Sequence, residues 1–183
     1  EYPLNCNFSE FKNNLFQYAE SEWIFQLDAD EYIAEDMLIH IDELLDNDPT
    51  MDAYHISRIN TVEGITLNEI DAWKWNIGRL PNYTTRCNIG DMTTSHYNLI
   101  RSCGFIYKDS TEELIHYDTP VINWPDHQCR LYRNKPEIRW ENKVHEQLKG
   151  FSKYGFITDP AWSIVHKKSL HKQIQQNEFY QTL

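Results

Sequence analysis

The chain has 183 residues, 40% of them hydrophobic and 14% aromatic, which suits one folded domain with a hydrophobic core rather than a disordered segment. Its formal net charge of -11 opposes binding to bare nucleic acid or to an anionic membrane. A phosphate-bearing ligand would need local neutralisation by a metal ion or by a few placed Arg and Lys side chains. No apolar run approaches the roughly 20 residues of a membrane span. Four cysteines without a CxxC pair predict free thiols in a reducing compartment, and hence a cytoplasmic protein.

Helix and strand signals alternate over the first 60 residues. The expected elements are a helix over residues 8–19, a strand over 22–27, an acidic turn over 28–31, a helix over 34–45 and a strand over 52–59. Ser9 or Asn7 is the expected N-cap of the first helix. This order is typical of an α/β domain with a parallel sheet.

The remaining sequence is less regular. Residues 60–120 predict long loops, with short strands near 97–100 and 105–107. The later expected elements are a strand over 128–133, a turn over 134–137, an extended segment over 138–140, a strand over 161–165 and a polar helix over 170–180. No internal repeat or linker divides the chain, so we expect a single domain.

Asp28 and Asp30 follow the predicted strand at a spacing of two residues. Because side chains alternate along a strand, both carboxylates would point the same way, toward the crevice where open α/β sheets bind ligands. Two carboxylates with open coordination positions suit Mg²⁺ or Mn²⁺ bridging phosphate oxygens. A solvated acidic turn before a helix, with Asp30 or Glu31 near the helix N-terminus, would give the same pattern.

Three later clusters contain further candidate residues. Glu146, next to His145, could act as a general base if its surroundings raised its pKa, or could form a surface ion pair with Lys143 or Lys149. His166 follows an apolar strand and could bind a metal ion, and the two lysines after it could meet phosphate. The arginines at positions 130, 133 and 139 could neutralise a diphosphate or form structural ion pairs.

These motifs, in this order, resemble the family 2 glycosyltransferases of the GT-A fold. The resemblance is to the branch with W-I-x-x-x-D-A-D-E, then R-L-Y/F-R, then I-x-W-x-x-x-V-H-E, then a late His. The corresponding segments are Trp23–Glu31, Arg130–Arg133, Ile138–Glu146 and His166. It implies a GT-A-like, Rossmann-like mixed α/β sheet flanked by helices. It also implies a metal-dependent enzyme that moves a sugar from a nucleotide-diphosphate sugar to an acceptor hydroxyl on a glycan, lipid or protein, with inversion.

The same resemblance implies roles for individual residues. The implied ligands of Mn²⁺ or Mg²⁺ are Asp28, Asp30 and His166, the implied donor-binding residues are Lys12, Asn13, Asp28 and Arg130, and the implied base is Glu146, with Asp126 competing for that role. Trp73, Trp75 and Trp124 could line the acceptor side, because flat aromatic faces suit sugar rings, or could fill the core.

The resemblance also implies a departure at the N-terminus. Members of this family carry further strands ahead of the first helix, where the base of the nucleotide binds. We therefore expect residues 1–183 to form a catalytic domain that is partial at its N-terminus. Two alternatives stay open: a truncated, non-catalytic binding or structural module, and another metal-dependent phosphoryl-transfer enzyme.

Overall fold

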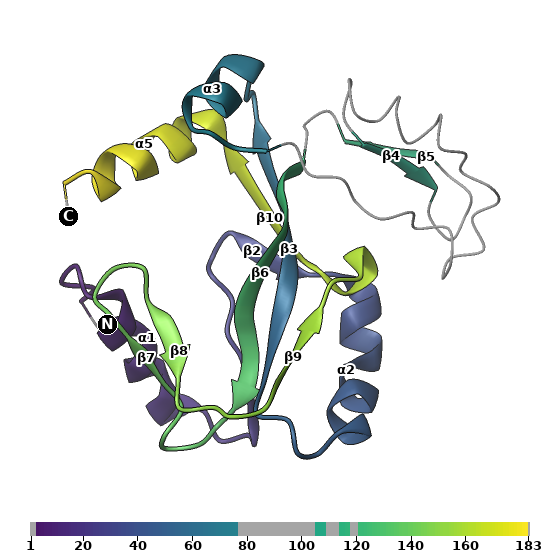
Figure 1. The fold of residues 1–183 in the computed structure, drawn as a ribbon, viewed down its shortest axis with the longest axis vertical. Coiled ribbons are helices and arrows are strands. Elements are labelled where there is room, and N and C mark those ends of the chain that lie inside the picture. Colours follow the sequence, from purple (N-terminus) through teal and green to yellow (C-terminus); the bar gives the residue numbers. More distant parts are fainter. Residues whose placement is uncertain (1–2, 77–104, 109–113, 118–120, 183) are drawn as a thin grey trace.

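The computed structural model describes residues 3–76, 105–108, 114–117 and 121–182 (Figure 1). Its main sheet has the strand order β1-β6-β3-β10-β2, and β9 also pairs with β3. These strands are β1 (Trp23–Phe25), β2 (Glu31–Ile33), β3 (Ala53–Glu63), β6 (Val121–Arg133), β9 (Tyr154–Ile157) and β10 (Ile164–Ser169). Two separate ribbons pair β4 (Phe105–Lys108) with β5 (Leu114–Tyr117) and β7 (Arg139–Glu141) with β8 (Gln147–Lys149).

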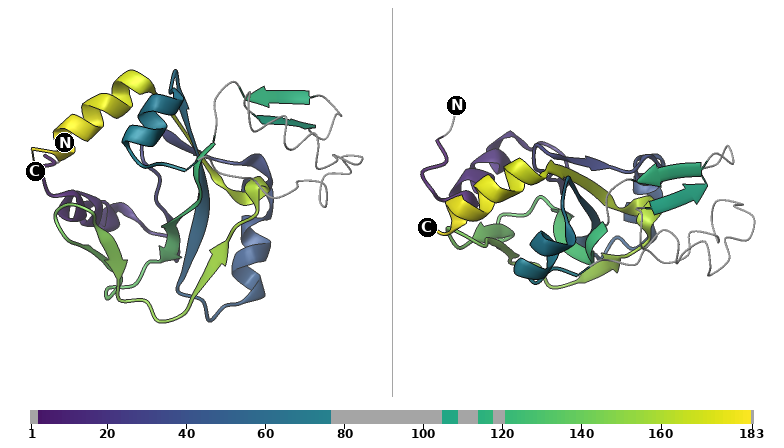
Figure 2. Two further views of the ribbon diagram at one scale, coloured as in Figure 1. Left: turned by 45° about the horizontal axis from the view of Figure 1, so that its top comes forward. Right: turned by 90° about the horizontal axis from the view of Figure 1, so that it is seen from above.

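Helices flank this sheet on several sides. They are α1 (Phe8–Leu15), α2 (Glu35–Asn47), α3 (Leu67–Ala72) and α5 (Leu170–Tyr180), with 3-10 turns η1 (Phe16–Tyr18) and η3 (Pro160–Trp162). The views in Figure 2 show the sheet curling between them. The two ends of the chain meet on one side, where the Phe8 and Tyr180 rings lie 6.4 Å apart between centroids.

The main sheet is mixed rather than parallel. Strands β9 and β10 run parallel to β3, whereas β6 runs antiparallel to both β1 and β3 and lies between them. The expected mixed α/β sheet with flanking helices is therefore confirmed. The simpler expectation of a parallel sheet from the first 60 residues was wrong, because β1 and β3 do not pair with each other. The long strand β6, which comes much later in the sequence, lies between β1 and β3 and pairs with both.

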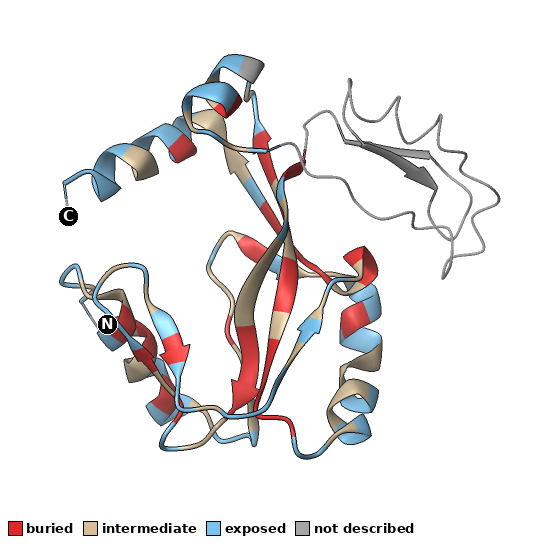
Figure 3. Cartoon of the chain, in the orientation of Figure 1, coloured by how far each residue is buried: buried red, intermediate tan, exposed pale blue. Residues whose placement is uncertain are grey.

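The core occupies both sides of the central strands β3 and β6, where buried residues concentrate in Figure 3. One cluster joins α2 to the sheet and contains the fully buried Met37, Ile56 and Ile164. A second cluster joins the sheet to β7 and the segment after α1, and it includes Tyr132 and Trp140. Burying one such large side chain contributes roughly 1.5–3 kcal/mol.

Several predicted helix and strand boundaries agree with the structure, and others differ from it. Asn7 caps α1 by accepting a hydrogen bond from the Glu10 N–H, and the predicted helices over 34–45 and 170–180 are present as α2 and α5. The predicted strand over 161–165 is wrong at its start. Asp159 caps a 3-10 turn that Pro160 begins, so β10 starts only at Ile164. The strand near 105–107 is present as β4, whereas the one near 97–100 lies outside the described residues.

Candidate active site

A cavity of about 550 Å³ opens where α1, the turn before β2, the strands β3, β6 and β10, and α5 come together. All the predicted site residues except Asn13 line it: Lys12, Asp28, Asp30, Asp126, Arg130, Glu146 and His166. Asn13 has another role. Its side-chain amide donates to the Trp140 carbonyl at 2.8 Å and accepts from the Trp140 N–H at 2.9 Å, which ties α1 to β7.

Glu31 holds the acidic turn through hydrogen bonds and ion pairs of its buried carboxylate. Its side chain is fully buried and accepts a hydrogen bond from the Asp28 N–H at 3.0 Å. The guanidinium groups of Arg58 and Arg130 each donate to its other oxygen at 2.8 Å. Two arginines surround this one buried carboxylate, because such a charge is tolerated only when it is paired and hydrogen-bonded. The sequence pattern placed Glu31 in the turn but did not predict this role.

Asp28 is paired with arginine. Its Oδ2 lies 2.5 Å from Arg130 Nη2, and its Oδ1 lies 3.9 Å from Lys12 Nζ. Burial acts to raise the pKa of the Asp28 carboxyl, but the charges of Arg130 and Lys12 outweigh it and hold that pKa below its ordinary value. Asp28 is therefore an ionised carboxylate that already has a strong partner.

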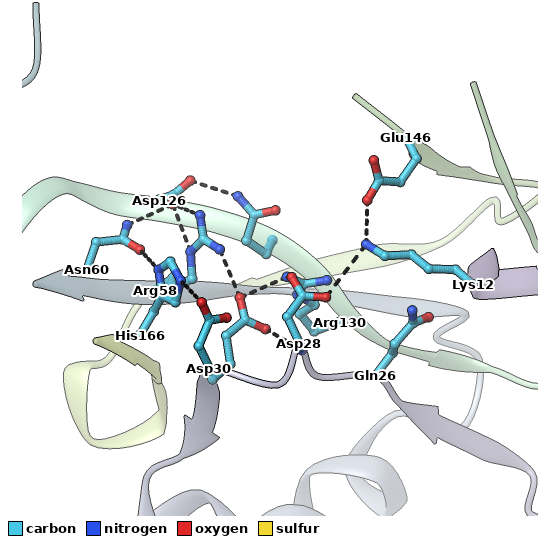
Figure 4. A network of polar contacts seen from close by, with 12 residues as sticks. Lys12, Gln26, Asp28, Asp30, Arg58, Asn60, Asp126, Arg130, Glu146 and His166 are labelled. Atoms are coloured by element: carbon cyan, nitrogen blue, oxygen red, sulfur yellow. Dashed lines mark hydrogen bonds and ion pairs between the residues drawn. The ribbon is translucent and has the colours of Figure 1, made fainter. Parts of the chain in front are cut away.

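Asp30 faces a different set of partners. Its Oδ2 lies 3.5 Å from His166 Nε2 and 3.5 Å from Lys168 Nζ. Strand β1 ends at Phe25, and Asp30 lies in a turn, so strand alternation does not explain why Asp28 and Asp30 both face the cavity. The turn and its polar contacts place them there, and Figure 4 shows the Asp28 carboxylate directed at Arg130 and the Asp30 carboxylate directed at His166.

His166 belongs to a chain of polar contacts that crosses three strands. Its Nδ1 lies 2.8 Å from Asn60 Oδ1, and the Asn60 amide nitrogen donates to Asp126 Oδ2 at 2.8 Å. Burial, followed by the charges of Arg58 and Lys168, lowers the pKa of the His166 ring below 6.5. The imidazole is therefore neutral at neutral pH and keeps a lone pair on one nitrogen.

Both carboxylate oxygens of Asp126 accept hydrogen bonds from neighbouring side chains. Arg58 donates to Oδ2 from Nε at 3.0 Å and from Nη2 at 2.7 Å, and Gln128 donates to Oδ1 at 2.8 Å. Burial acts to raise the pKa of Asp126, but Arg58 and the hydrogen bond from Asn60 hold it below its ordinary value. A carboxylate whose pKa these donors hold down is poorly suited to take a proton from a substrate.

Glu146 has a single ion-pair partner among the described residues. Its Oε1 lies 2.5 Å from Lys12 Nζ, and 18% of its side chain is exposed. The expected surface pairs with Lys143 and Lys149 do not form. Lys12 is itself buried, and its ammonium group lies 4.4 Å from the centre of the Trp140 ring. Glu146 is thus held at the edge of the cavity by a residue from the first helix.

Some of the other predicted candidates line the cavity, and others only stabilise the fold. Arg133 donates to the carbonyls of Met51 and Pro49, and Arg139 donates to main-chain carbonyls around β7, so both are structural. Trp75 lines the cavity, and Trp73 packs edge-on against it with ring centroids 4.8 Å apart. Cavity residues that the sequence pattern missed include Arg58, Asn60 and Gln128, which carry no local signal of their own.

The cavity offers few ligands for a divalent cation. Within the described part of the chain, no group of three His, Cys, Asp or Glu side chains is arranged to hold a metal ion. Asp30 and His166 do offer a carboxylate oxygen and an imidazole nitrogen on facing side chains. Two protein ligands of this kind fit a cation whose other positions are filled by phosphate and water. Asp28 fits this role less well, because Arg130 occupies it.

Comparisons with known proteins add no relative. No protein-family model matches the chain, and no curated protein is significantly similar to it. Among the described helices, none has both the length and the apolar character needed to cross a membrane. The function therefore has to be inferred from the chemistry of the cavity.

Proposed function

We propose that the chain belongs to the catalytic domain of a metal-dependent, inverting glycosyltransferase with a GT-A-like fold. The main support is that residues from all four sequence motifs line one cavity. Cationic side chains, the Asp30–His166 pair and the Glu146 carboxylate lie there together, although Lys12 and His166 are far apart in the sequence. The mixed α/β sheet with flanking helices is consistent with the fold that the motif resemblance implies.

The half of the cavity around the acidic turn suits a diphosphate. Lys12 and Lys168 present ammonium groups there, each near a carboxylate that a phosphate oxygen can replace as partner. Arg130 has its charge balanced by Asp28 and Glu31, so it orients the turn more than it supplies free positive charge. Asp30 and His166 would hold the metal ion, which when bound would neutralise charge on the diphosphate leaving group.

The rest of the cavity lining suits a sugar acceptor. It includes aromatic side chains and carboxamides: Phe8, Trp75, His145, Tyr180, Asn123, Gln173 and Gln176. Rings of this kind can cover the apolar face of a sugar, and carboxamides can bind its hydroxyl groups.

Glu146 is the base in this scheme. Its carboxylate takes the proton from the acceptor hydroxyl while that oxygen bonds to the anomeric carbon, and the bond from that carbon to the diphosphate oxygen breaks. Attack from the face opposite the leaving group inverts the anomeric centre. Asp126 is the weaker candidate, because Arg58, Asn60 and Gln128 already occupy its oxygens.

Another metal-dependent phosphoryl-transfer enzyme is the first alternative. It would use the same metal-binding pair and the same cations, so only the reaction that the protein catalyses separates it from a glycosyltransferase. The second alternative is a non-catalytic binding module. An assay for release of the nucleotide diphosphate distinguishes it from an enzyme.

The test is to incubate the protein with a panel of uridine and guanosine diphosphate sugars and Mn²⁺, and to measure release of the nucleotide diphosphate with and without simple glycoside acceptors. Release from at least one donor is expected. Glu146→Gln should lower turnover by about 10²-fold or more while leaving Mn²⁺ binding unchanged. The matched control is Glu141→Gln, on the exposed side of the neighbouring strand β7, which should keep its rate.

Two results would count against this scheme. If no donor in the panel loses its nucleotide diphosphate, the chain is not a transferase for these donors and the binding-module alternative is favoured. If Glu146→Gln keeps the full rate while Asp126→Asn loses it, the base has been assigned to the wrong carboxylate.

A further inference from the structure

Asn60 connects two parts of the cavity that are distant in the sequence. It lies on β3, in register with His166 on the parallel strand β10 and next to the antiparallel strand β6 on its other side. Its carbonyl oxygen lies 2.8 Å from His166 Nδ1, and its amide nitrogen lies 2.8 Å from Asp126 Oδ2. Both ends of this one side chain are therefore committed (Figure 4).

The chemistry of Asp126 fixes the direction of these hydrogen bonds. An ionised carboxylate only accepts, and two donors from Arg58 keep Asp126 in that form. The Asn60 amide must turn its NH₂ group toward Asp126, because the flipped amide would place two oxygens against each other. The Asn60 carbonyl then faces the imidazole, and since a carbonyl only accepts, the Nδ1 of His166 must carry a proton.

This direction determines the state of the other ring nitrogen. A neutral imidazole carries one proton, so a proton on Nδ1 leaves a lone pair on Nε2. That nitrogen is the one that faces Asp30, at 3.5 Å from Oδ2. Histidines that bind metals commonly use their second ring nitrogen to donate to an oxygen in this way, which fixes both the tautomer and the ring orientation.

We propose that Asn60 is a positioning residue that holds His166 in the Nδ1–H tautomer, so that Nε2 and the Asp30 carboxylate form a two-ligand site for a divalent cation. Lys168, also 3.5 Å from Asp30, is the group that the cation displaces, and its ammonium already has a second partner in Gln176 at 2.7 Å. The use of this cation in sugar transfer rests on the proposed function, whereas the tautomer and the cation binding do not.

The first measurement needs only the wild-type protein. Long-range ¹H–¹⁵N NMR of ¹⁵N-histidine-labelled protein at pH 7.5 distinguishes a protonated ring nitrogen from one with a lone pair, and His166→Gln identifies the His166 signals. We expect Nδ1 to be protonated and Nε2 not. A neutral His166 with its proton on Nε2 would overturn the proposal, whatever any variant does.

Variants then test whether Asn60 is responsible. Asn60→Leu removes the acceptor, so the His166 signals should move toward the Nε2–H tautomer, and the affinity for Mn²⁺ alone, followed by EPR, should fall about 10-fold or more. The isosteric Asn60→Asp keeps an acceptor opposite Nδ1 but sets a second oxygen against Asp126, so it should keep the proton on Nδ1 and be less stable than the wild type. Gln128→Leu is the matched control, since it also removes one hydrogen bond to Asp126 but does not touch His166.

The outcomes separate this proposal from the enzymatic one. If Asn60→Leu leaves the tautomer unchanged, or if Gln128→Leu shifts it equally, Asn60 does not set the tautomer. If Mn²⁺ binds equally well to the wild type and to His166→Gln, the cation site is elsewhere. If Mn²⁺ binding depends on Asn60 and His166 as expected but no sugar nucleotide is consumed, only the glycosyltransferase proposal fails.

Discussion

Glu31→Gln is the most informative single perturbation of stability. The substitution keeps the size of the side chain and removes only its charge. The side chain of Glu31 is fully buried, and two guanidinium groups donate to it at 2.8 Å, as does the Asp28 N–H at 3.0 Å. A glutamine also brings an NH₂ group that cannot accept from any of these donors.

The expected cost follows from the buried charges left behind. Removing one partner from a buried ion pair costs about 3–5 kcal/mol when the remaining charge is left without compensation. Arg130 is the more buried partner, with 4% of its side chain exposed against 19% for Arg58. Because Arg130 keeps Asp28 and Arg58 keeps Asp126, we expect a loss at the lower end, about 3 kcal/mol. With an m-value of about 2 kcal/mol/M, this loss moves the urea midpoint down by about 1.5 M.

The assay is equilibrium urea unfolding, followed by tryptophan fluorescence at pH 7. The control is Glu22→Gln, which removes the charge of an exposed carboxylate paired with Arg133, and should cost under about 1 kcal/mol. A loss below about 1 kcal/mol for Glu31→Gln would refute the reasoning. It would mean that Asp28 and Asp126 are sufficient partners for the two arginines and that Glu31 does not hold the acidic turn.

Two further predictions concern other parts of the fold. Gly150→Ala should cost at least about 2 kcal/mol by thermal or urea unfolding, because φ is +87° and the added Cβ would lie 1.8 Å from the Glu137 carbonyl oxygen. Gly64→Ala, at a φ of +83° but with its added Cβ only in ordinary contact with Leu170 Cβ at 3.8 Å, should cost about 1 kcal/mol, and equal losses would contradict the steric explanation. Asp52→Asn should lower stability at pH 7 by about 1–3 kcal/mol, because hydrogen bonds from Lys135 and the loop after β8 hold the pKa of Asp52 below its ordinary value of 3.8. Because the pKa of Asp52 is depressed in the folded state, its ionised form stabilises the protein above the ordinary pKa, and this stabilisation is lost as pH falls toward the folded-state pKa. The difference in unfolding free energy between the wild type and Asp52→Asn should therefore be smaller at pH 3 than at pH 7. A difference that does not change with pH would contradict the assignment.

Much of the secondary structure could be read from local pattern. The apolar spacing of residues 34–45 predicts α2, and the polar helix over 170–180 is present as α5. Helical spacing and caps are properties of neighbouring residues, so a short window contains them. The short strand β2 escaped prediction, because its three residues pair with β10, which lies more than a hundred residues away.

The cavity was predicted in part. The order of the motifs indicated that Asp28, Arg130 and His166 would meet, and they line one cavity. Their partners did not follow from the motifs. Arg58 sits in an ordinary strand pattern, and its contacts with Glu31 and Asp126 form only because β3 lies between β6 and β10.

The sequence by itself determined which residue types could carry chemistry and which helices and strands would present them, because both depend on composition and short-range periodicity. Only the tertiary structure decided how each group is used. Asp28 became the partner of an arginine, Asp30 the neighbour of a histidine, and Asp126 the acceptor of hydrogen bonds from Arg58, although the three share one side-chain chemistry. The difference is physical: a carboxylate takes its role from the charges and donors that the fold packs around it.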